Sequence, residues 1–303
     1  MHDTPVSQRS AQDGFLRYSG VISLCHAATA EKVMDTKTRH SFPVYESPDY
    51  VQWVDAGRRV KLDSKLADHL SVKVYRYCSL AEALMILRSR SWAFARPSAW
   101  PDVYEKHVGV ELFADAAVFE KLPGYVKCVS LEYSSEAMWR AYSSPGGLVR
   151  LSWVLSDLVD VLDAATFPED GKIYLAAARY VEAPTIRSEV ARVKKMGAKQ
   201  VSQEAMRILM MKRFGFASEN EIRICFFPAK KHLGDYCVAR LPSDLKVDRL
   251  LIDPYLPSWQ ARELAAMFTK DVKVPFPVSQ SRFDTVYDSA SDKMKKRSKK
   301  SDP

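Results

Sequence analysis

The chain contains little glycine, which makes up 11 of its 303 residues. It has no G-x-x-x-x-G-K-[ST] loop and no G-x-G-x-x-G turn, the two patterns that bring backbone N–H groups close to nucleotide phosphates. It also lacks the G-x-S-x-G elbow of α/β-hydrolases. The sequence therefore disfavours P-loop, Rossmann and serine-hydrolase chemistry.

Metal-ligand and disulfide patterns are missing as well. The five cysteines are odd in number and form no C-x-x-C pair, and the six histidines form no H-E-x-x-H motif. Structural zinc sites need closely spaced cysteine or histidine ligands, so we expect no metal site. Reduced and mostly buried thiols are typical of a cytoplasmic protein.

No apolar run reaches the roughly 18 residues that a membrane-spanning helix requires, so we expect no membrane association. Residues 21–30 have the apolar core and small residues of a signal peptide. They contain His26, however, and they follow an overlong leader that carries Asp3 and Asp13. We therefore expect no signal peptide.

Positive charge is in excess. The formal net charge is +8, and residues 293–300 are almost all lysine or arginine. Such a run is typical of a disordered, solvated end, and it also attracts phosphate backbones independently of sequence. Residues 1–70 show no clear hydrophobic period. We expect an N-terminal extension over residues 1–70 that packs on the core, a main domain over residues 71–288 and a disordered basic tail over residues 289–303.

Strands and helices alternate irregularly through the main domain. The pattern of β-forming residues predicts strands over residues 72–77, 91–95, 125–131, 148–153, 172–181, 236–241 and 247–252, and one near Val272. Ser79, with Glu82 three residues later, predicts a capping box that begins a helix. Further helices are expected over residues 103–120, 134–142, 157–165, 258–268 and 186–214, the last broken near Gly197. Because long β-α-β periods are absent, we expect an α+β fold with mixed, mostly antiparallel sheets and flanking helices.

One stretch brings two carboxylates together. Residues 216–227 predict a strand in which Glu219, Glu221 and Arg223 share one face, because residues two apart in a strand point the same way. Two carboxylates on one face repel each other, so such a pair suggests a function that requires both. Catalysis at a developing positive charge is such a function. The alternative is an edge strand whose acids are neutralised by Arg223 and by solvent.

A metal-dependent nuclease is a weaker interpretation of another stretch. Such an enzyme needs carboxylates near a lysine, and Asp102, Glu105 and Lys106 supply these residue types. No second acid on a predicted strand lies near them in the sequence. Asp102 and Glu105 are also suited to cap the helix expected after them.

Five short motifs follow one another between residues 72 and 227: Tyr75-Arg76-Tyr77, the loop from Phe94 to Glu105, Val129-Ser130-Leu131, Met138-Trp139-Arg140-Ala141-Tyr142 and Glu219-Asn220-Glu221-Ile222-Arg223. Their order resembles that of a widespread bacterial family of domains of unknown function. Its members carry Tyr-Lys/Arg-Tyr, a Pro-Ser-x-Phe-Asn-Asp-Pro-Phe-Glu loop, Ser-Leu-Ser, Trp-x-x-Tyr and Glu-x-Glu-x-Arg. The loop departs from this pattern, since Pro101 stands where the family usually has asparagine and Val103 where it has proline.

The order of a strand-borne arginine, a serine-bearing strand and a Glu-x-Glu strand is similar to that of ADP-ribosyltransferases of the Arg-Ser-Glu type. This resemblance implies an ADP-ribosyltransferase-like core that uses NAD as a substrate. Glu221 would stabilise the oxocarbenium-like charge on the ribose, and Glu219 would orient or deprotonate the acceptor. Arg76 would hold a phosphate or ribose of NAD. The remaining candidates are Ser130 or else Ser98 at the nicotinamide ribose, Tyr75, Trp139 and Tyr142 as stacking rings, and Arg96, Asp102 and Glu105 in a substrate loop.

Several of these candidates also have a structural interpretation. Arg76 is suited to pair with Glu219 or Glu221 across strands, and Trp139 and Tyr142 are suited to anchor a helix on the core.

The sequence thus predicts a cytoplasmic transferase that modifies a nucleic acid or a protein. The resemblance implies a toxin or phage-defence effector with a possible neutralising partner. The alternative is a non-catalytic nucleic-acid-binding protein, favoured by the net charge, by residues 187–213 and by the tail.

Overall fold

The structure is a computed structural model, and it describes residues 51–100, 102, 105–106, 124–133, 135–142, 147–196, 204, 206–229 and 234–282. The chain divides into Met1–Phe42 and Pro43–Pro303, and all described residues belong to the second part. The basic tail and most of the helix expected over residues 103–120 lie outside the described residues.

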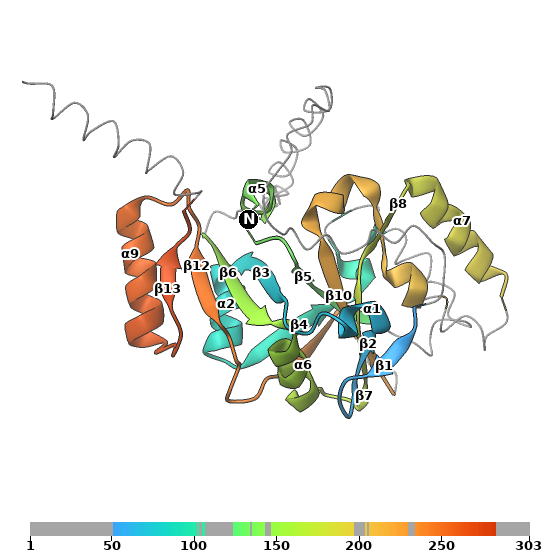
Figure 1. The fold of residues 1–303 in the computed structure, drawn as a ribbon, viewed down its shortest axis with the longest axis horizontal. Coiled ribbons are helices and arrows are strands. Elements are labelled where there is room, and N and C mark those ends of the chain that lie inside the picture. Colours follow the sequence, from blue (N-terminus) through green and yellow to red (C-terminus); the bar gives the residue numbers. More distant parts are fainter. Residues whose placement is uncertain are drawn as a thin grey trace, which may run out of the picture. The chain divides into compact units, whose positions relative to one another are not determined.

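A large mixed sheet forms the centre of the described part (Figure 1). Its strands follow the order β1-β2-β7-β10-β5-β3-β6-β12-β13, with β4 beside β5 and β11 beside β4. Among these strands only the β2–β7 and β12–β13 pairs are parallel. The sheet is therefore mostly antiparallel, and the expected α+β class is confirmed. The strands are β1 Trp53–Asp55, β2 Val60–Asp63, β3 Lys73–Ser79, β4 Ser91–Ala95, β5 Tyr125–Ser130, β6 Leu148–Val154, β7 Gly171–Ala177, β10 Glu221–Pro228, β11 Tyr236–Arg240, β12 Arg249–Ile252 and β13 Val278–Gln280.

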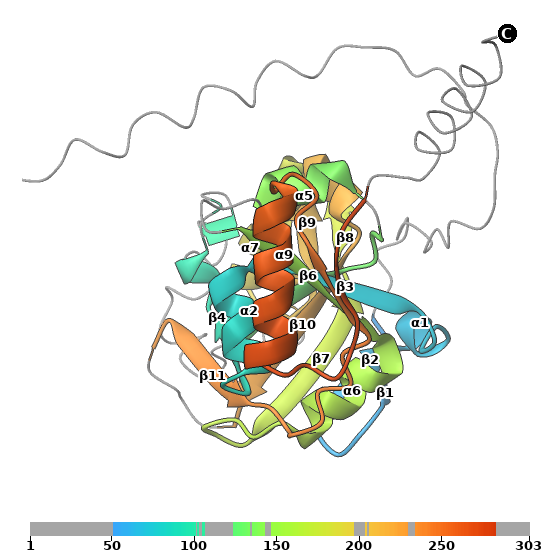
Figure 2. The same ribbon diagram turned by 90° about the vertical axis from the view of Figure 1, so that its left-hand side faces the viewer.

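Helices cover both faces of this sheet. In Figure 1, α5 (Glu136–Tyr142) lies above the sheet and α6 (Leu155–Ala164) lies below it. Figure 2 shows α9 (Ser258–Ala266) beside β12 and β13. The other helices are α1 Ser64–Ala67, α2 Leu80–Leu87, α7 Ala183–Lys194, the 3-10 helices η1 Pro97–Ala99 and η2 Phe214–Glu219, and the π-helix η3 Met267–Asp271. Within the described ranges, no helix has the length and apolar character that crossing a membrane requires.

Strand β10 shows why the two faces of the sheet differ. All eight of its residues are buried, because β5 and β7 pair with it on either side. Ile222, Ile224 and Phe226 point to the α6 side, where Phe226 stacks on Phe167 with ring centroids 4.0 Å apart. Glu221 and Arg223 alternate with them and point to the α5 side. One face of the strand is thus hydrophobic, and the other buries charge.

The acidic stretch differs from its prediction in two ways. Residues 214–219 form the 3-10 helix η2, and Asn220 turns the chain in the left-handed region with φ of 43°. Asparagine tolerates this conformation better than most residues do. The strand begins only at Glu221, so Glu219 is not part of it. The edge-strand interpretation is also wrong, because β10 is an interior strand.

Three further boundaries are corrected. Of the helix expected over residues 186–214 with a break near Gly197, the first part ends at Lys194 and residues 204 and 206–209 are helical again. Met211–Arg213, however, is the strand β9, which pairs in parallel with β8 (Arg179–Val181). The strand expected near Val272 lies instead at Val278–Gln280. Residues 53–63, expected in an N-terminal extension, supply β1 and β2 of the sheet. In each case pairing with a distant strand overrides the local pattern.

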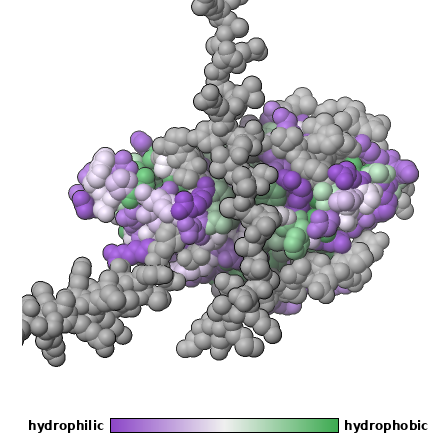
Figure 3. All heavy atoms as spheres, turned by 90° about the horizontal axis from the view of Figure 1, so that it is seen from above, coloured by the Kyte–Doolittle hydropathy of each residue, from purple (hydrophilic) through white to green (hydrophobic). Residues whose placement is uncertain are grey.

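The surface is mixed. Figure 3 shows hydrophilic and hydrophobic side chains interspersed on the face that it draws. Large hydrophobic side chains that are exposed include Tyr133, Tyr236 and Trp259. Scattered residues of this kind are normal for a folded protein and do not by themselves mark a binding surface.

Candidate functional site

The candidate site is a recess between β3 and β5. The two strands are joined at one residue pair, Tyr75 with Ser130, and separate beyond it. The recess is shallow, and its space of about 230 Å³ includes open solvent. Six of its lining residues were expected from the sequence to be functional, and they come from segments far apart in the chain: Tyr75, Arg76, Ser130, Tyr142, Glu219 and Glu221.

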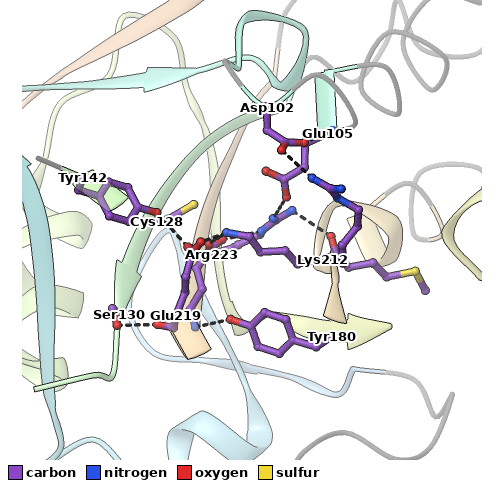
Figure 4. Close-up of polar contacts among 12 residues, drawn as sticks. Asp102, Glu105, Cys128, Ser130, Tyr142, Tyr180, Lys212, Glu219 and Arg223 are labelled. Carbon is purple, nitrogen blue, oxygen red and sulfur yellow. Dashed lines mark hydrogen bonds and ion pairs between the residues drawn. The ribbon is translucent and has the colours of Figure 1, made fainter. Parts of the chain in front are cut away.

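A buried lysine joins the two glutamates at this recess. Lys212 on β9 donates to Glu219 Oε2 at 2.8 Å and to Glu221 Oε2 at 2.5 Å (Figure 4). The Tyr142 hydroxyl donates to Glu219 Oε2 at 2.9 Å. The 3-10 turn before β10 therefore carries Glu219 back to the same cation that holds Glu221. The sequence correctly grouped the two carboxylates, although not by the path that it predicted.

Arg223 extends the network towards the loop before β5. Its Nε donates to Glu221 Oε1 at 2.7 Å, its NH2 group pairs with Glu105, and its NH1 group donates to the Leu209 carbonyl at 2.6 Å. We call Glu105, Lys212, Glu219, Glu221 and Arg223 the Glu219 cluster.

Asp102 takes the capping role that the sequence allowed, whereas the Glu105 carboxylate pairs with Arg223 instead. The Glu105 backbone N–H donates to Asp102 Oδ1 at 2.8 Å, and Asp102 Oδ2 accepts from Arg213 at 2.7 Å. Both carboxylates are thus held by arginines. The described residues also include no group of three or more His, Cys, Asp or Glu side chains placed to hold a metal ion.

The charges of Glu221 and Lys212 are fixed over a wide pH range. Burial alone would raise the pKa of Glu221, but Arg223 and Lys212 outweigh it and lower that pKa to about 2. Burial likewise opposes the charge on Lys212, yet Glu221, Glu219 and Glu105 hold its pKa above the ordinary value. Neither group can exchange a proton readily near neutral pH. Their effect on a ligand is therefore electrostatic.

Glu219 and Glu221 differ in how many of their carboxylate oxygens accept hydrogen bonds. Both oxygens of Glu221 accept from cations, and the residue is 4 % exposed. Glu219 is 8 % exposed, and both of its side-chain hydrogen bonds fall on Oε2. Oε1 of Glu219 accepts from no donor among the described residues. Of the two carboxylates at the recess, Glu219 is the one with an oxygen left for a ligand.

Ser130 supports this turn. Its hydroxyl donates to the Glu219 carbonyl at 2.6 Å and accepts from the Glu132 N–H at 2.9 Å. It lines the recess as expected, but its hydroxyl serves the backbone and fixes the position of Glu219.

Arg76 is among the residues that line the recess, but its guanidinium is not directed at the two glutamates. It alternates with Tyr75 and Tyr77 on β3, so its side chain points to the opposite face, towards α2. There it makes a two-pronged contact with Glu82, at 3.1 Å to Oε1 and 2.9 Å to Oε2. Arg76 does not pair with Glu219 or Glu221, and its guanidinium already binds both oxygens of Glu82. Neither expected role is therefore observed.

Other expected residues separate into two groups. Tyr75 lines the recess, but Trp139 is fully buried and packs edge-on against Tyr77 with centroids 5.0 Å apart, so it serves as a core anchor. Ser98 lies in η1, and the Arg96 guanidinium lies 5.5 Å from the centroid of the Tyr125 ring. Ser98, Arg96 and Trp139 are not among the residues that line the recess.

The sequence missed two residues of the site. Lys212 lies in a stretch for which the sequence predicts a long helix. Tyr180 lies near the end of a predicted strand, and its hydroxyl accepts from the Glu221 N–H at 2.8 Å. Neither has a sequence pattern that distinguishes it from other lysines and tyrosines. Only the pairing of β8 with β9, next to the start of β10, brings both to the glutamates.

The basic stretch over residues 187–213 is partly neutralised within itself. Arg192 pairs with Glu189 and Glu204, and Arg207 pairs with the same two carboxylates. This network weakens the case that the described part of the stretch attracts nucleic acid.

No protein-family model, curated protein or solved structure matches the chain. The family resemblances of the sequence therefore stay predictions, and the geometry of the recess is the basis for a functional proposal.

Proposed function

We propose that the protein is an NAD-dependent ADP-ribosyltransferase-like enzyme whose recess between β3 and β5 takes the nicotinamide-ribose end of NAD. The observation that carries this proposal is the position of Glu219, a carboxylate at the recess with one oxygen that accepts from no described residue. The acceptor is a nucleic acid or a protein.

The charge balance supports chemistry at a cationic centre. The Glu219 cluster contains three carboxylates and two cations, which gives a net charge of 3 × (−1) + 2 × (+1) = −1. Cleavage of NAD breaks the bond between ribose C1′ and the nicotinamide nitrogen. The bonding electron pair leaves with nicotinamide, and positive charge develops on the ribose. A fixed negative charge stabilises that state more than it stabilises bound NAD.

The structure suggests a different division of labour between the two glutamates. Glu219, whose Oε1 accepts from no described residue, faces the ribose. Glu221 holds Lys212 and Arg223 in place, and those cations in turn orient Glu219 and Glu105. In transfer, the acceptor nucleophile bonds to C1′ and gives its proton to Glu219 or to water. Catalysis here relies mainly on a preorganised field.

The form of the recess supports binding of one end of NAD rather than all of it, because the recess is shallow and open to solvent. The tyrosines Tyr75 and Tyr142 provide flat, partly apolar walls that suit a nicotinamide ring.

The test is nicotinamide release from NAD, measured with and without nucleic-acid and protein acceptors. Glu219→Gln keeps the size of the side chain and loses its charge, so we expect release to slow by about 100-fold or more. NAD affinity, measured by calorimetry, should change little, because ground-state ribose carries little positive charge. Glu82→Gln is the matched control, since Glu82 lies on the opposite face, and its rate per folded molecule should equal that of the wild type.

Two results would contradict the proposal. One is a wild-type protein that releases no nicotinamide with any acceptor and is not stabilised thermally by NAD. The other is a Glu219→Gln protein as active as the wild type. If nucleic acid nevertheless binds in a salt-dependent manner, the non-catalytic alternative takes the place of the transferase.

A further inference from the structure

Arg150 is a buried arginine surrounded by tyrosines. It lies on β6 directly opposite Tyr77 of β3, and it is 3 % exposed. Its guanidinium carbon lies 4.6 Å from the centroid of the Tyr75 ring, 4.8 Å from that of Tyr133 and 5.8 Å from that of Tyr77. Arg150 thus points to the α5 side of the sheet, as Glu221 does.

The charge on Arg150 lacks a counter-ion within the described part of the chain. Two other cations are as deeply buried, and both contact carboxylates: Lys212 contacts Glu219 and Glu221, and Arg223 contacts Glu221 and Glu105. Arg150 makes no ion pair with a described residue, and its Nε has no hydrogen-bond partner there. A buried charge without a counter-ion is costly, and contacts with aromatic rings offset only part of that cost, so the contrast points to an anionic ligand.

This arginine adjoins the recess. Tyr75 and Tyr77 line the recess and contact Arg150 as well. Tyr133, the third ring, is 59 % exposed, so it is the side chain that a ligand displaces to reach the guanidinium. We propose that Arg150, with Tyr75 and Tyr77, forms the subsite that holds a phosphate group of the nucleotide whose other end occupies the recess, and that Tyr133 covers this subsite. The proposal rests on the proposed function, because it assigns the phosphate-holding role in that same site.

The chemistry of the subsite favours phosphate. A guanidinium donates two parallel N–H groups to phosphate oxygens, which is the geometry that gives arginine its preference for this anion. Burial raises the pKa of Tyr75 to about 12, even though Arg150 acts to lower it, and the Tyr75 hydroxyl therefore stays protonated as a further donor. Arg150 takes the role that the sequence suggested for Arg76, whose fork is occupied by Glu82.

The experiment is titration of the purified full chain with inorganic pyrophosphate by calorimetry. Arg150→Lys keeps the positive charge but loses the two parallel N–H donors of the guanidinium. We expect it to weaken pyrophosphate binding by about tenfold or more. Arg249→Lys on β12 is the matched control, because it makes the same change on a neighbouring strand at an exposed side chain. It should bind as the wild type does. Unfolding curves establish that each variant is folded.

Tyr133→Ala keeps the proposal testable if Arg150→Lys does not fold. It uncovers the guanidinium and should bind pyrophosphate at least as tightly as the wild type. Wild-type protein that does not bind pyrophosphate, or an Arg150→Lys protein that is folded and binds as tightly as the wild type, overturns the subsite. So does a tenfold loss of affinity in Tyr133→Ala.

The subsite and the proposed function can fail separately. If pyrophosphate binding depends on Arg150 while NAD is never cleaved, the phosphate subsite stands and the transferase does not. If nicotinamide is released with the same KM and kcat in wild type and Arg150→Lys, the transferase stands and the subsite does not.

Discussion

The central strands bury one ion cluster on each face of the sheet, and the two clusters differ in how completely they are paired. On the α2 face, Glu82 Oε1 accepts from Arg76, Lys127 and Trp92, and Oε2 accepts from Arg76. We call these four residues the Glu82 cluster. On the α5 face, the Glu219 cluster leaves Glu219 Oε1 without a donor among the described residues.

This difference separates a structural cluster from a candidate functional one. The Glu82 cluster joins α2 to β3, β4 and β5 and has no acceptor left for a ligand. The Glu219 cluster lies at a recess and keeps an acceptor there. Burial and charge alone do not distinguish the two, since the carboxyl groups of Glu82 and Glu221 both have a pKa lowered to about 2 by neighbouring cations that outweigh burial. What distinguishes the two clusters is Glu219 Oε1, which accepts from no described residue.

The largest expected effect is a loss of stability when the Glu82 cluster on the α2 face loses its carboxylate. Glu82→Ala leaves Arg76 and Lys127 close together without their shared carboxylate, and losing one partner of a buried ion pair costs about 3–5 kcal/mol. Urea denaturation at pH 7 measures the loss. Glu136→Ala is the matched control, because its ion pair with Arg140 is exposed to solvent and contributes little to stability. Equal losses in the two variants would contradict the structural role of Glu82.

An intermediate effect is expected from Glu221→Gln, and it depends on pH. The folded-state pKa of Glu221 is about 2, below its ordinary value of 4.5. Its contribution to stability is therefore present above about pH 4.5 and is lost as the pH falls towards 2. At pH 7 we expect the variant to lose about 2–4 kcal/mol of unfolding free energy.

The measurement for Glu221→Gln is a series of urea denaturations between pH 7 and pH 2. The gap between wild type and variant should close as Glu221 becomes protonated. Glu263→Gln, an exposed change on α9, should show no gap at any pH. Parallel curves for wild type and Glu221→Gln would mean that Glu221 does not draw its stability from Lys212 and Arg223.

The smallest expected effect is that of Tyr142→Phe, which removes one hydrogen bond to Glu219 Oε2. A hydrogen bond to a charged group contributes about 1.5 kcal/mol or more, so nicotinamide release should slow by about tenfold while the fold is kept. Tyr236→Phe, at an exposed ring on β11, is the control and should leave the rate unchanged. A larger loss than that of Glu219→Gln would transfer the main catalytic role from the carboxylate to the tyrosine.

Local patterns predicted most of the elements. Ser79 does begin α2 and accepts from the Glu82 N–H at 3.2 Å. The Glu82 side chain, however, turns to Arg76 and Lys127, and so the expected capping box is half formed. The helix cap depends on residues three apart, whereas the ion cluster depends on the approach of β3 and β5.

The candidate site likewise depends partly on the local sequence pattern and partly on tertiary contacts. Alternation along the chain determined that Glu221 and Arg223 share a face, because side chains two apart in a strand always do. Tertiary structure alone decided that Lys212 neutralises the pair. Lys212 lies on β9, which becomes a strand only by pairing with β8. The sequence has no local signal for such a contact.

What the sequence by itself determined is the α+β class, the order of most strands and helices and the grouping of Glu219 with Glu221. These follow from hydrophobic alternation and from short-range geometry. Tertiary structure decided which face each charge occupies and which partner it meets. Strand register placed Tyr75, Ser130 and Glu221 in one row across three strands, turned Arg76 to the opposite face and left Arg150 among the tyrosines. The physical reason is that register and pairing depend on contacts between segments far apart in the chain, which local pattern does not encode.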